Sequence, residues 1–258
     1  MNASVVIWSK QMSKFVRSGE EWLGALIQPV LWVVLFGVGM RSLLEPALSD
    51  GDTYVSFILP GIIALTVLSS ATTGGMGWLV ERVQGIVKEY LVAPIARISI
   101  LLGNAAGIMT KALIQSVVIL MVGVLVGATV SGSAADWLLS FALVLLFGVG
   151  FSGIALAAAS STDDIGGYHM MIALLQLPML FMSNALYPLD ALPTWLAWAA
   201  LFNPASYLVD GLRQTILADA LSMAGSRLLP LWGCFAVCAA FATAGMLLAL
   251  GVLRKSLR

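Results

Sequence analysis

Few side chains in this 258-residue sequence could carry out chemistry, and they are isolated from one another. His169 is the only histidine and cannot build a metal site alone, and no serine or cysteine is identifiable as its partner for nucleophilic catalysis. Cys234 and Cys238 lie four residues apart in an apolar run, where a regular helix does not let two cysteines bridge. We expect all three side chains to serve packing, and we predict no metal site and no catalytic residue.

One group of polar side chains lies within apolar sequence and could contact a transported molecule. Lys111 is the clearest charge of this kind, with Thr110, Gln115 and Gln176 as polar companions. Two interpretations of Lys111 are open: a cation in a cytoplasm-facing cavity, or a long side chain that extends to the inner surface of a membrane. Lys111, Gln115 and Gln176 are the candidate cavity residues.

The sequence contains no nucleotide-binding loop. Such loops combine a glycine-rich stretch with a following Lys-Ser or Lys-Thr, and no such stretch occurs. We expect this chain to bind no cofactor, so any ATP-driven activity requires hydrolysis by another chain.

The elements that must position these side chains are membrane helices. The sequence is 60% hydrophobic and 10% charged, whereas soluble domains carry about 25% charged residues. About 20 apolar residues cross a bilayer as a helix, and six segments qualify: 22–40, 54–79, 98–128, 137–160, 168–187 and 228–252. We predict an all-α membrane protein with six transmembrane helices, a single domain over residues 1–258.

The distribution of positive charge predicts the orientation of these spans. Lys and Arg that flank a span are retained in the cytoplasm. The net charge of zero, a separate observation, gives no indication of a nucleic-acid partner. With the amino terminus inside, the cytoplasmic pieces hold Lys10, Lys14, Arg17, Arg82, Lys88, Arg97, Arg254, Lys255 and Arg258, and the outer loops hold Arg41, Arg213 and Arg227. Both termini are therefore predicted to be cytoplasmic. The apolar run 22–40 is longer than a typical signal-peptide core, so we retain it as the first span.

Residues 1–20 contain an amphipathic segment, which we predict to be an interfacial helix over 3–20. Val5, Trp8, Met12 and Phe15 form an apolar stripe, and three basic residues form another. The alternative is a frayed cytoplasmic tail, which the apolar stripe argues against.

The cytoplasmic connection over 81–97 also has amphipathic character. It is charged at both ends, contains Ile86, Val87 and Leu91, and reaches Pro94, which would stop a helix. A plain loop does not need these apolar residues. Docking against a partner and packing on the membrane surface both remain open.

The outer connection over 188–227 is long yet rich in aromatic residues. Asn203-Pro204 is a helix start, with Asn as cap and Pro in the first turn, and Pro193 could begin another short helix. Asp210 and Arg213 are spaced to pair on the second helix. We predict two outer-leaflet helices that enter the membrane and return, and the alternative is an aromatic belt without a role in transport.

Three stretches together resemble the membrane subunits of ABC-type-2 transporters, bacterial exporters of drugs, antibiotics, lipids and polysaccharides. The first runs from Glu81 through Glu89 and Pro94 to Leu101-Leu102-Gly103. The second is Ala185-Leu186-Tyr187-Pro188 with Leu192-Pro193, and the third runs from Asn203-Pro204 through Tyr207 and Asp210 to Arg213. The resemblance covers nearly the whole chain.

This resemblance implies a function and its partners. Two permease chains, expected to be identical, would form the export pathway in the bacterial inner membrane, in contact with membrane lipid. Two copies of a separate ATP-binding cassette subunit would bind ATP and Mg and drive efflux, including antibiotic resistance, of a drug, lipid or lipid-linked glycan. This chain would itself be no enzyme.

The resemblance also assigns roles to particular residues. Residues 81–95 would form the coupling helix that fits a groove of the ATPase, with Glu81, Gly85, Glu89, Leu91 and Pro94 as its matching positions. Residues 188–218 would form the re-entrant outer helices, with Pro188, Pro193, Asn203, Pro204, Tyr207, Asp210 and Arg213 as theirs.

The alternative function is a secondary transporter driven by an ion gradient. Such proteins commonly place ionisable groups near the membrane midplane, but every acidic residue here maps to a loop or to the end of a span. Lys111 without a carboxylate is a poor site for proton coupling. A membrane hydrolase is disfavoured because His169 has no identifiable nucleophile.

Overall fold

The computed structural model describes residues 3–39, 54–87, 96–186, 193–217 and 229–256. Its helices, in chain order, are α1 (Ala3–Arg17), α2 (Gly19–Gly39), α4 (Tyr54–Val83), α6 (Arg97–Val126), α7 (Ala134–Ser161), α8 (Ile165–Phe181), α9 (Thr194–Phe202), α10 (Pro204–Ile216) and α11 (Leu231–Ser256). The described ranges contain no strand. The predicted all-α fold class is therefore confirmed.

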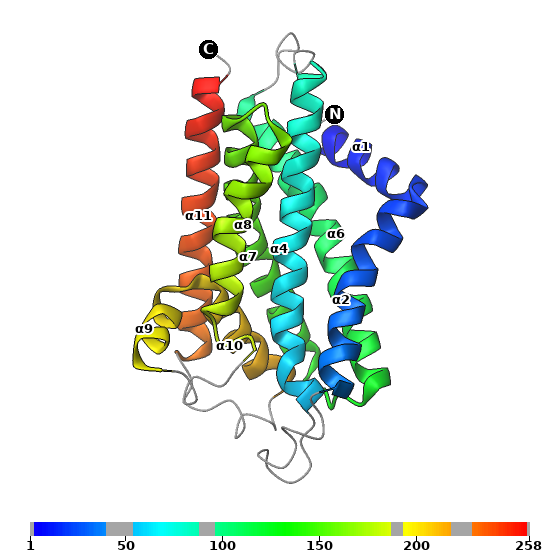
Figure 1. Ribbon diagram of the computed structural model, residues 1–258, viewed down its shortest axis with the longest axis vertical. Helices are drawn as coiled ribbons and strands as arrows, with labels where there is room; N and C mark the ends of the chain where they lie inside the picture. The colour runs from blue at the N-terminus through cyan, green and yellow to red at the C-terminus, as the bar shows by residue number, and fades with distance from the viewer. Residues whose placement is uncertain (1–2, 40–53, 88–95, 187–192, 218–228, 257–258) are drawn as a thin grey trace.

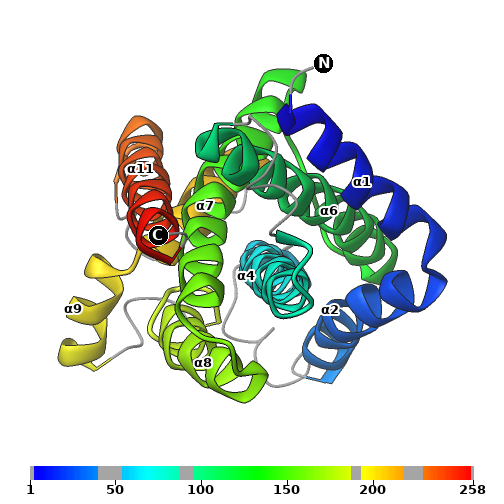
Figure 2. The same ribbon diagram turned by 90° about the horizontal axis from the view of Figure 1, so that it is seen from above.

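Helix α4 is the centre of the bundle. Residues 54–68 are buried without interruption, and α2, α6, α7 and α8 pack around the helix (Figures 1 and 2). A helix that is apolar all round is typical of a protein core or a membrane span, and here other helices enclose it. The polar residues in the second half of α4 are therefore the exception to this pattern.

Four of the six predicted spans correspond to helices that are long and apolar enough to cross a membrane, namely α4, α6, α7 and α11. The other two, 22–40 and 168–187, coincide with α2 and α8, whose apolar parts are shorter: Leu26–Gly37 and Ile165–Phe181. Helix α8 ends at Phe181, and residues 182–186 form a turn instead of continuing the span. The chain has the architecture of a multi-pass membrane protein.

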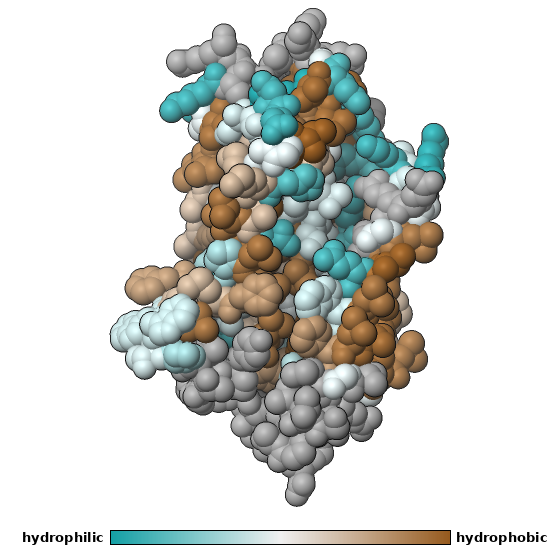
Figure 3. Space-filling model, in the orientation of Figure 1, coloured by the Kyte–Doolittle hydropathy of each residue, from teal (hydrophilic) through white to brown (hydrophobic). Residues whose placement is uncertain are grey.

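The two ends of the described chain lie at the same end of the bundle. In Figure 1, the start of α1 and the end of α11 both lie towards the top of the view, on opposite sides of the bundle. In Figure 3, polar side chains gather at this end, and hydrophobic ones cover the exposed flank of α2.

Helix α1 packs along α6 with a face that differs from the predicted stripe. Ile7 and Phe15 are buried, whereas Val5 is 51% exposed, and Trp8 and Met12 are half-buried. The stripe predicted to face the membrane therefore does not coincide with the face that packs on α6, and its contact with a membrane stays a prediction.

A close approach of backbones explains which face α1 presents to α6. A Cβ atom at Gly103 of α6 would collide with Ile7, so the missing side chain makes room for α1. Trp8 Nε1 also donates a hydrogen bond to Thr110 Oγ1 at 3.0 Å. These contacts depend on the residues of α6, so the hydrophobic pattern of α1 alone does not predict them.

Helices α9 and α10 occupy the opposite end of the bundle from the termini (Figure 1). Pro193 precedes α9, and Asn203 caps α10 with Pro204 in its first turn. Both helix starts lie where the sequence indicated. Their position relative to a membrane stays a prediction.

Candidate functional site

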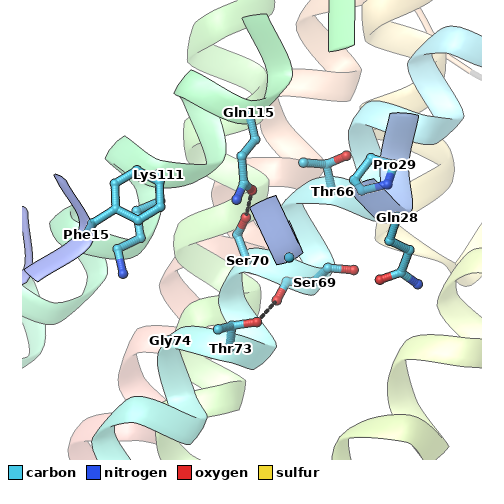
Figure 4. A pocket seen from close by; sticks show the side chains of 11 residues that line it. Phe15, Gln28, Pro29, Thr66, Ser69, Ser70, Thr73, Gly74, Lys111 and Gln115 are labelled. Carbon is cyan, nitrogen blue, oxygen red and sulfur yellow. Dashed lines mark hydrogen bonds between the residues drawn. The ribbon is translucent and has the colours of Figure 1, made fainter. Parts of the chain in front are cut away.

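A polar recess lies between α2, α4 and α6, beside the end of α1 (Figure 4). Its volume is about 280 Å³. Six of its eleven lining residues carry neutral hydrogen-bonding groups: Gln28, Thr66, Ser69, Ser70, Thr73 and Gln115. The remaining wall residues are Phe15, Gly24, Pro29, Gly74 and Lys111. We use the name polar recess for the space enclosed by these residues.

The hydroxyl groups of α4 share a face because of their spacing. Thr66, Ser69, Ser70 and Thr73 are three or four residues apart, which places them on one side of a helix. The sequence analysis did not identify these residues. Their helical spacing within an otherwise apolar segment was the signal that could have found them.

Hydrogen bonds arrange the side chains of the recess. Ser70 Oγ donates to Gln115 Oε1 across the interface of α4 and α6. Thr73 Oγ1 donates to the carbonyl oxygen of Ser69 at 3.0 Å, and Thr66 Oγ1 donates to that of Ile62 at 2.8 Å. Figure 4 shows how the side chains of α4 and α6 meet at Ser70 and Gln115.

Lys111 lies in the wall of the recess, beside Phe15 of α1. Its Nζ atom is 4.8 Å from the centroid of the Phe15 ring, a distance suited to a cation–π interaction. Lys111 is half-buried and Phe15 is fully buried. The structure thus brings together Lys111 and Gln115, two of the three predicted cavity residues.

Gln176, the third predicted cavity residue, lies on α8 and is not part of the recess wall. It accepts a hydrogen bond from Thr72 Oγ1 at 3.1 Å and donates to Ser69 Oγ at 3.4 Å. Since Ser69 lines the recess as well, a continuous row of polar groups crosses α4 from α6 to α8.

The end of α4 near the termini is fixed by charged contacts on two sides. Lys10 of α1 forms an ion pair with Glu81 at 2.9 Å. Arg82 pairs with Asp163 at 2.5 Å and donates to the carbonyl oxygen of Ala159 at 3.0 Å. The last turn of α4 is therefore connected both to α1 and to the turn between α7 and α8.

The predicted coupling segment, 81–95, is divided at Gly85. Glu81 and Arg82 belong to α4, and Gly85 has a φ of +80° in the turn that follows the helix. This left-handed conformation is accessible to glycine without strain. Glu89, Leu91 and Pro94 lie outside the described residues.

At the opposite end of the bundle, Asn203 joins three elements. Its Oδ1 accepts a hydrogen bond from the backbone nitrogen of Ala205 at 3.0 Å, which caps α10. Its Nδ2 donates to the carbonyl oxygens of Met179 and Met182 at 2.8 and 3.1 Å. Tyr207 Oη donates to the carbonyl oxygen of Leu201 at 2.6 Å and thereby joins α10 to α9. Pro188 lies outside the described residues.

Asp210 and Arg213 do not form the predicted ion pair. The Nη2 atom of Arg213 instead donates to the carbonyl oxygens of Asn184 and Phe57 at 2.9 and 3.3 Å, and its guanidinium carbon is 4.1 Å from the centroid of the Phe57 ring. Asp210 accepts from Gln214 Nε2 at 3.1 Å. Spacing within one helix allowed the pair, but Arg213 donates to other elements of the bundle and Asp210 accepts from another residue of its own helix.

An all-helical bundle with several apolar helices and a polar recess among them has the features of a membrane transport protein. The sequence model of the ABC-2 type transporter family matches residues 3–217. The chain belongs to this family.

Named relatives agree with this assignment. The chain is 33% identical to the putative transport permease ycf38 of Porphyra purpurea over 193 residues, 74% of this chain and 66% of the relative. It is 26% identical to the inner membrane transport permease YadH of Escherichia coli K12 over 82% of this chain and 81% of the relative. Nodulation protein J of Rhizobium leguminosarum bv. viciae is 28% identical over 78% of this chain and 76% of the relative. The family and these names support a transport permease, and the ion-gradient alternative is not favoured.

Proposed function

We propose that this chain is the permease subunit of an ATP-binding cassette exporter. It moves a hydrophobic or amphipathic substrate outward, and a separate ATPase subunit binds and hydrolyses ATP with Mg. Family membership supports this function, and the sequence contains no phosphate-binding loop of its own. The observation that carries it is the polar row on α4, set in a helix that is otherwise enclosed and apolar.

The six-span arrangement requires α2 and α8 to cross the membrane as well. An even number of crossings returns the chain to its starting side. This fits the location of the start of α1 and the end of α11 at the same end of the bundle (Figure 1). The positive charge near these ends favours the cytoplasmic side. We assign the chain to a bacterial inner membrane, by analogy with the YadH relative, which is named an inner membrane transport permease.

A second, identical chain completes the proposed pathway. Helices α2 and α8 both expose apolar side chains, including Leu31 and Leu35 on α2 and Leu174 and Phe181 on α8. Both helices flank the central α4 (Figure 2). Two protomers that pack through these faces would enclose their polar rows between them, whereas lipid would otherwise cover the same surfaces.

The ATPase drives the cycle through the proposed coupling segment, 81–95, and one ATPase subunit docks on each protomer. Closure of the ATPase pair around ATP moves this segment and favours the outward-open state of a two-state equilibrium. The ion pairs of Glu81 and Arg82 pass the movement to α1 and to the start of α8. On the other side of the membrane, the re-entrant helices over 188–218 form the exit.

Charge reversal at the coupling segment tests this function. Glu89→Lys should abolish co-purification of the ATPase and the response of its activity to substrate, because it introduces a like or unpaired charge at the docking surface. Glu45→Lys, in the connection between α2 and α4, is the matched control: the same charge reversal on the predicted outer side should retain both. If the ATPase still co-purifies with the Glu89→Lys protein and still responds to substrate, the assignment is wrong.

A further inference from the structure

Side-chain hydrogen bonds fix the middle of α4 to its neighbours. Ser70 Oγ donates to Gln115 Oε1 of α6. Thr72 Oγ1 donates to Gln176 Oε1 of α8 at 3.1 Å, and Tyr168 Oη of the same helix donates to the carbonyl oxygen of Thr72 at 2.7 Å. This part of α4 is therefore connected to both α6 and α8.

A second group of contacts fixes the last turns of α4. Trp78 Nε1 donates to Ser160 Oγ of α7 at 3.0 Å. The ion pairs of Glu81 and Arg82 join these turns to α1 and to the turn that follows α7. Since the proposed coupling segment begins at Glu81, a movement of that segment reaches these turns first.

The stretch between the two groups has no hydrogen bond of this kind. Residues 73–77 read Thr-Gly-Gly-Met-Gly, and Thr73 donates to the carbonyl oxygen of Ser69 within α4 itself. Among the described residues, no side chain of 73–77 forms a hydrogen bond with another helix. The two fixed parts of α4 are thus separated by about one turn of helix that is rich in glycine.

Packing explains two of the three glycines in this stretch. A Cβ atom at Gly74 would collide with Ile108 of α6, and one at Gly75 would collide with Tyr168 Oη. A Cβ atom at Gly77, in contrast, would meet no described atom within 4 Å. Glycine weakens the interior of a helix relative to alanine. Backbone freedom, which packing does not require here, is therefore the property that sets Gly77 apart.

We propose that Gly77 is a hinge at which the last turns of α4 tilt relative to the enclosed part of the helix. The close contacts at Gly74 and Gly75 hold the fixed side. A hollow of about 60 Å³ between α1, α4 and α6, which Gly77 borders, gives space for the tilt. Because Glu81 is paired with α1, the tilt also displaces Phe15, a wall residue of the polar recess. The role of the hinge rests on the proposed function, in which the ATPase supplies the movement.

Spin-label distances in the full-length permease alone, in phosphatidylcholine nanodiscs, test whether α4 bends. Labels at Val83→Cys on α4 and Leu248→Cys on α11 occupy exposed positions, and the buried Cys234 and Cys238 should take up little label. The chain with Gly77 should give a broad distance distribution. Gly77→Ala should give a narrower one, because alanine favours the continuous helix.

A matched control separates the hinge from a general effect of alanine. Gly251→Ala is suitable because a Cβ atom there also meets no described atom within 4 Å, but on α11. It should leave the distance distribution unchanged. Thermal unfolding of the Gly77→Ala chain should occur at the same or a higher temperature, so that a folding defect does not account for the narrowing.

The assembled transporter provides a second readout. Gly77→Ala should lower the amount of substrate exported per ATP hydrolysed by about five- to tenfold, the range of a typical coupling free energy. The ATPase should still co-purify, since the substitution lies outside the proposed docking segment.

Two outcomes would overturn the hinge: equal distance distributions for the Gly77→Ala and unsubstituted chains, or full export by the Gly77→Ala transporter. The distance measurement contains no ATPase, so its result is independent of the Glu89→Lys test. A failed Glu89→Lys test would remove the ATPase as the source of the movement and would leave the measured distances unaffected.

Discussion

At the residue scale, Arg213 is the most unusual side chain of the described structure. It is 2% exposed and lies among α4, α10 and the turn after α8. Its Nε and Nη1 atoms have no hydrogen-bond partner among the described residues. Burial of a guanidinium costs free energy, and this one donates to two backbone carbonyl oxygens. We interpret Arg213 as the residue that holds α10 to α4 and to the turn after α8.

Removal of this guanidinium should destabilise the protein. Arg213→Ala leaves the carbonyl oxygen of Asn184 without this donor and removes the second hydrogen bond to the carbonyl oxygen of Phe57, and we expect the free energy of unfolding to fall by about 3 kcal/mol. Denaturant titration in mixed micelles measures it. Arg254→Ala, at an exposed position of α11, is the control and should change stability by less than about 0.5 kcal/mol. Equal stability of the two variants would refute the role of Arg213.

At the scale of elements, α7 and α11 show how glycine permits close helix packing. A Cβ atom at Gly245 of α11 would collide with the backbone carbonyl of Gly150 on α7, and one at Gly153 would collide with the backbone of Gly245. Small residues let membrane helices approach until their backbones touch, where dispersion contacts are dense. The position of α11 on the bundle therefore depends on these three glycines.

A single methyl group should separate these helices. Gly245→Ala forces α7 and α11 apart, and we expect a loss of about 1–3 kcal/mol of stability from overpacking. Gly251→Ala is the matched control on the same helix, because a Cβ atom there meets nothing within 4 Å. It should be neutral or slightly stabilising, since alanine favours helices. Thermal unfolding of both variants in the same nanodiscs gives the comparison.

At the scale of the whole molecule, α2 and α8 expose the apolar faces through which the proposed protomers would associate. Leu31 is 50% exposed and Leu174 is 66% exposed, although each belongs to a helix that packs against α4 on its other side. Lipid or a second chain can cover such surfaces. The proposed pathway requires the second chain.

Cysteine crosslinking distinguishes these two possibilities. Co-expressed Leu31→Cys and Leu174→Cys chains should form a crosslinked dimer with a bifunctional maleimide, because the proposed interface places α2 of one protomer against α8 of the other. The native Cys234 and Cys238 are buried and should react little. Leu125→Cys on α6 is 85% exposed in the monomer and serves as the control. Dimers formed as readily through position 125 would contradict the proposed interface.

Hydrophobic length predicted the all-helical class and the location of the long apolar helices, because a membrane span must satisfy its backbone within one continuous segment. The start of α10 at Asn203-Pro204 was also predictable, since a cap acts on backbone groups two residues away. Such features are local, so the order of residues along the chain is sufficient to reveal them.

Only the tertiary structure decided which polar groups meet. Ser70 and Gln115 are distant in sequence and become neighbours because α4 packs on α6, and Arg213 leaves Asp210 for carbonyl oxygens of other elements. The buried face of α1 likewise follows from the glycine at position 103 of α6. Each of these contacts depends on a second helix, and the sequence of one helix carries no information about which neighbour will supply its partner.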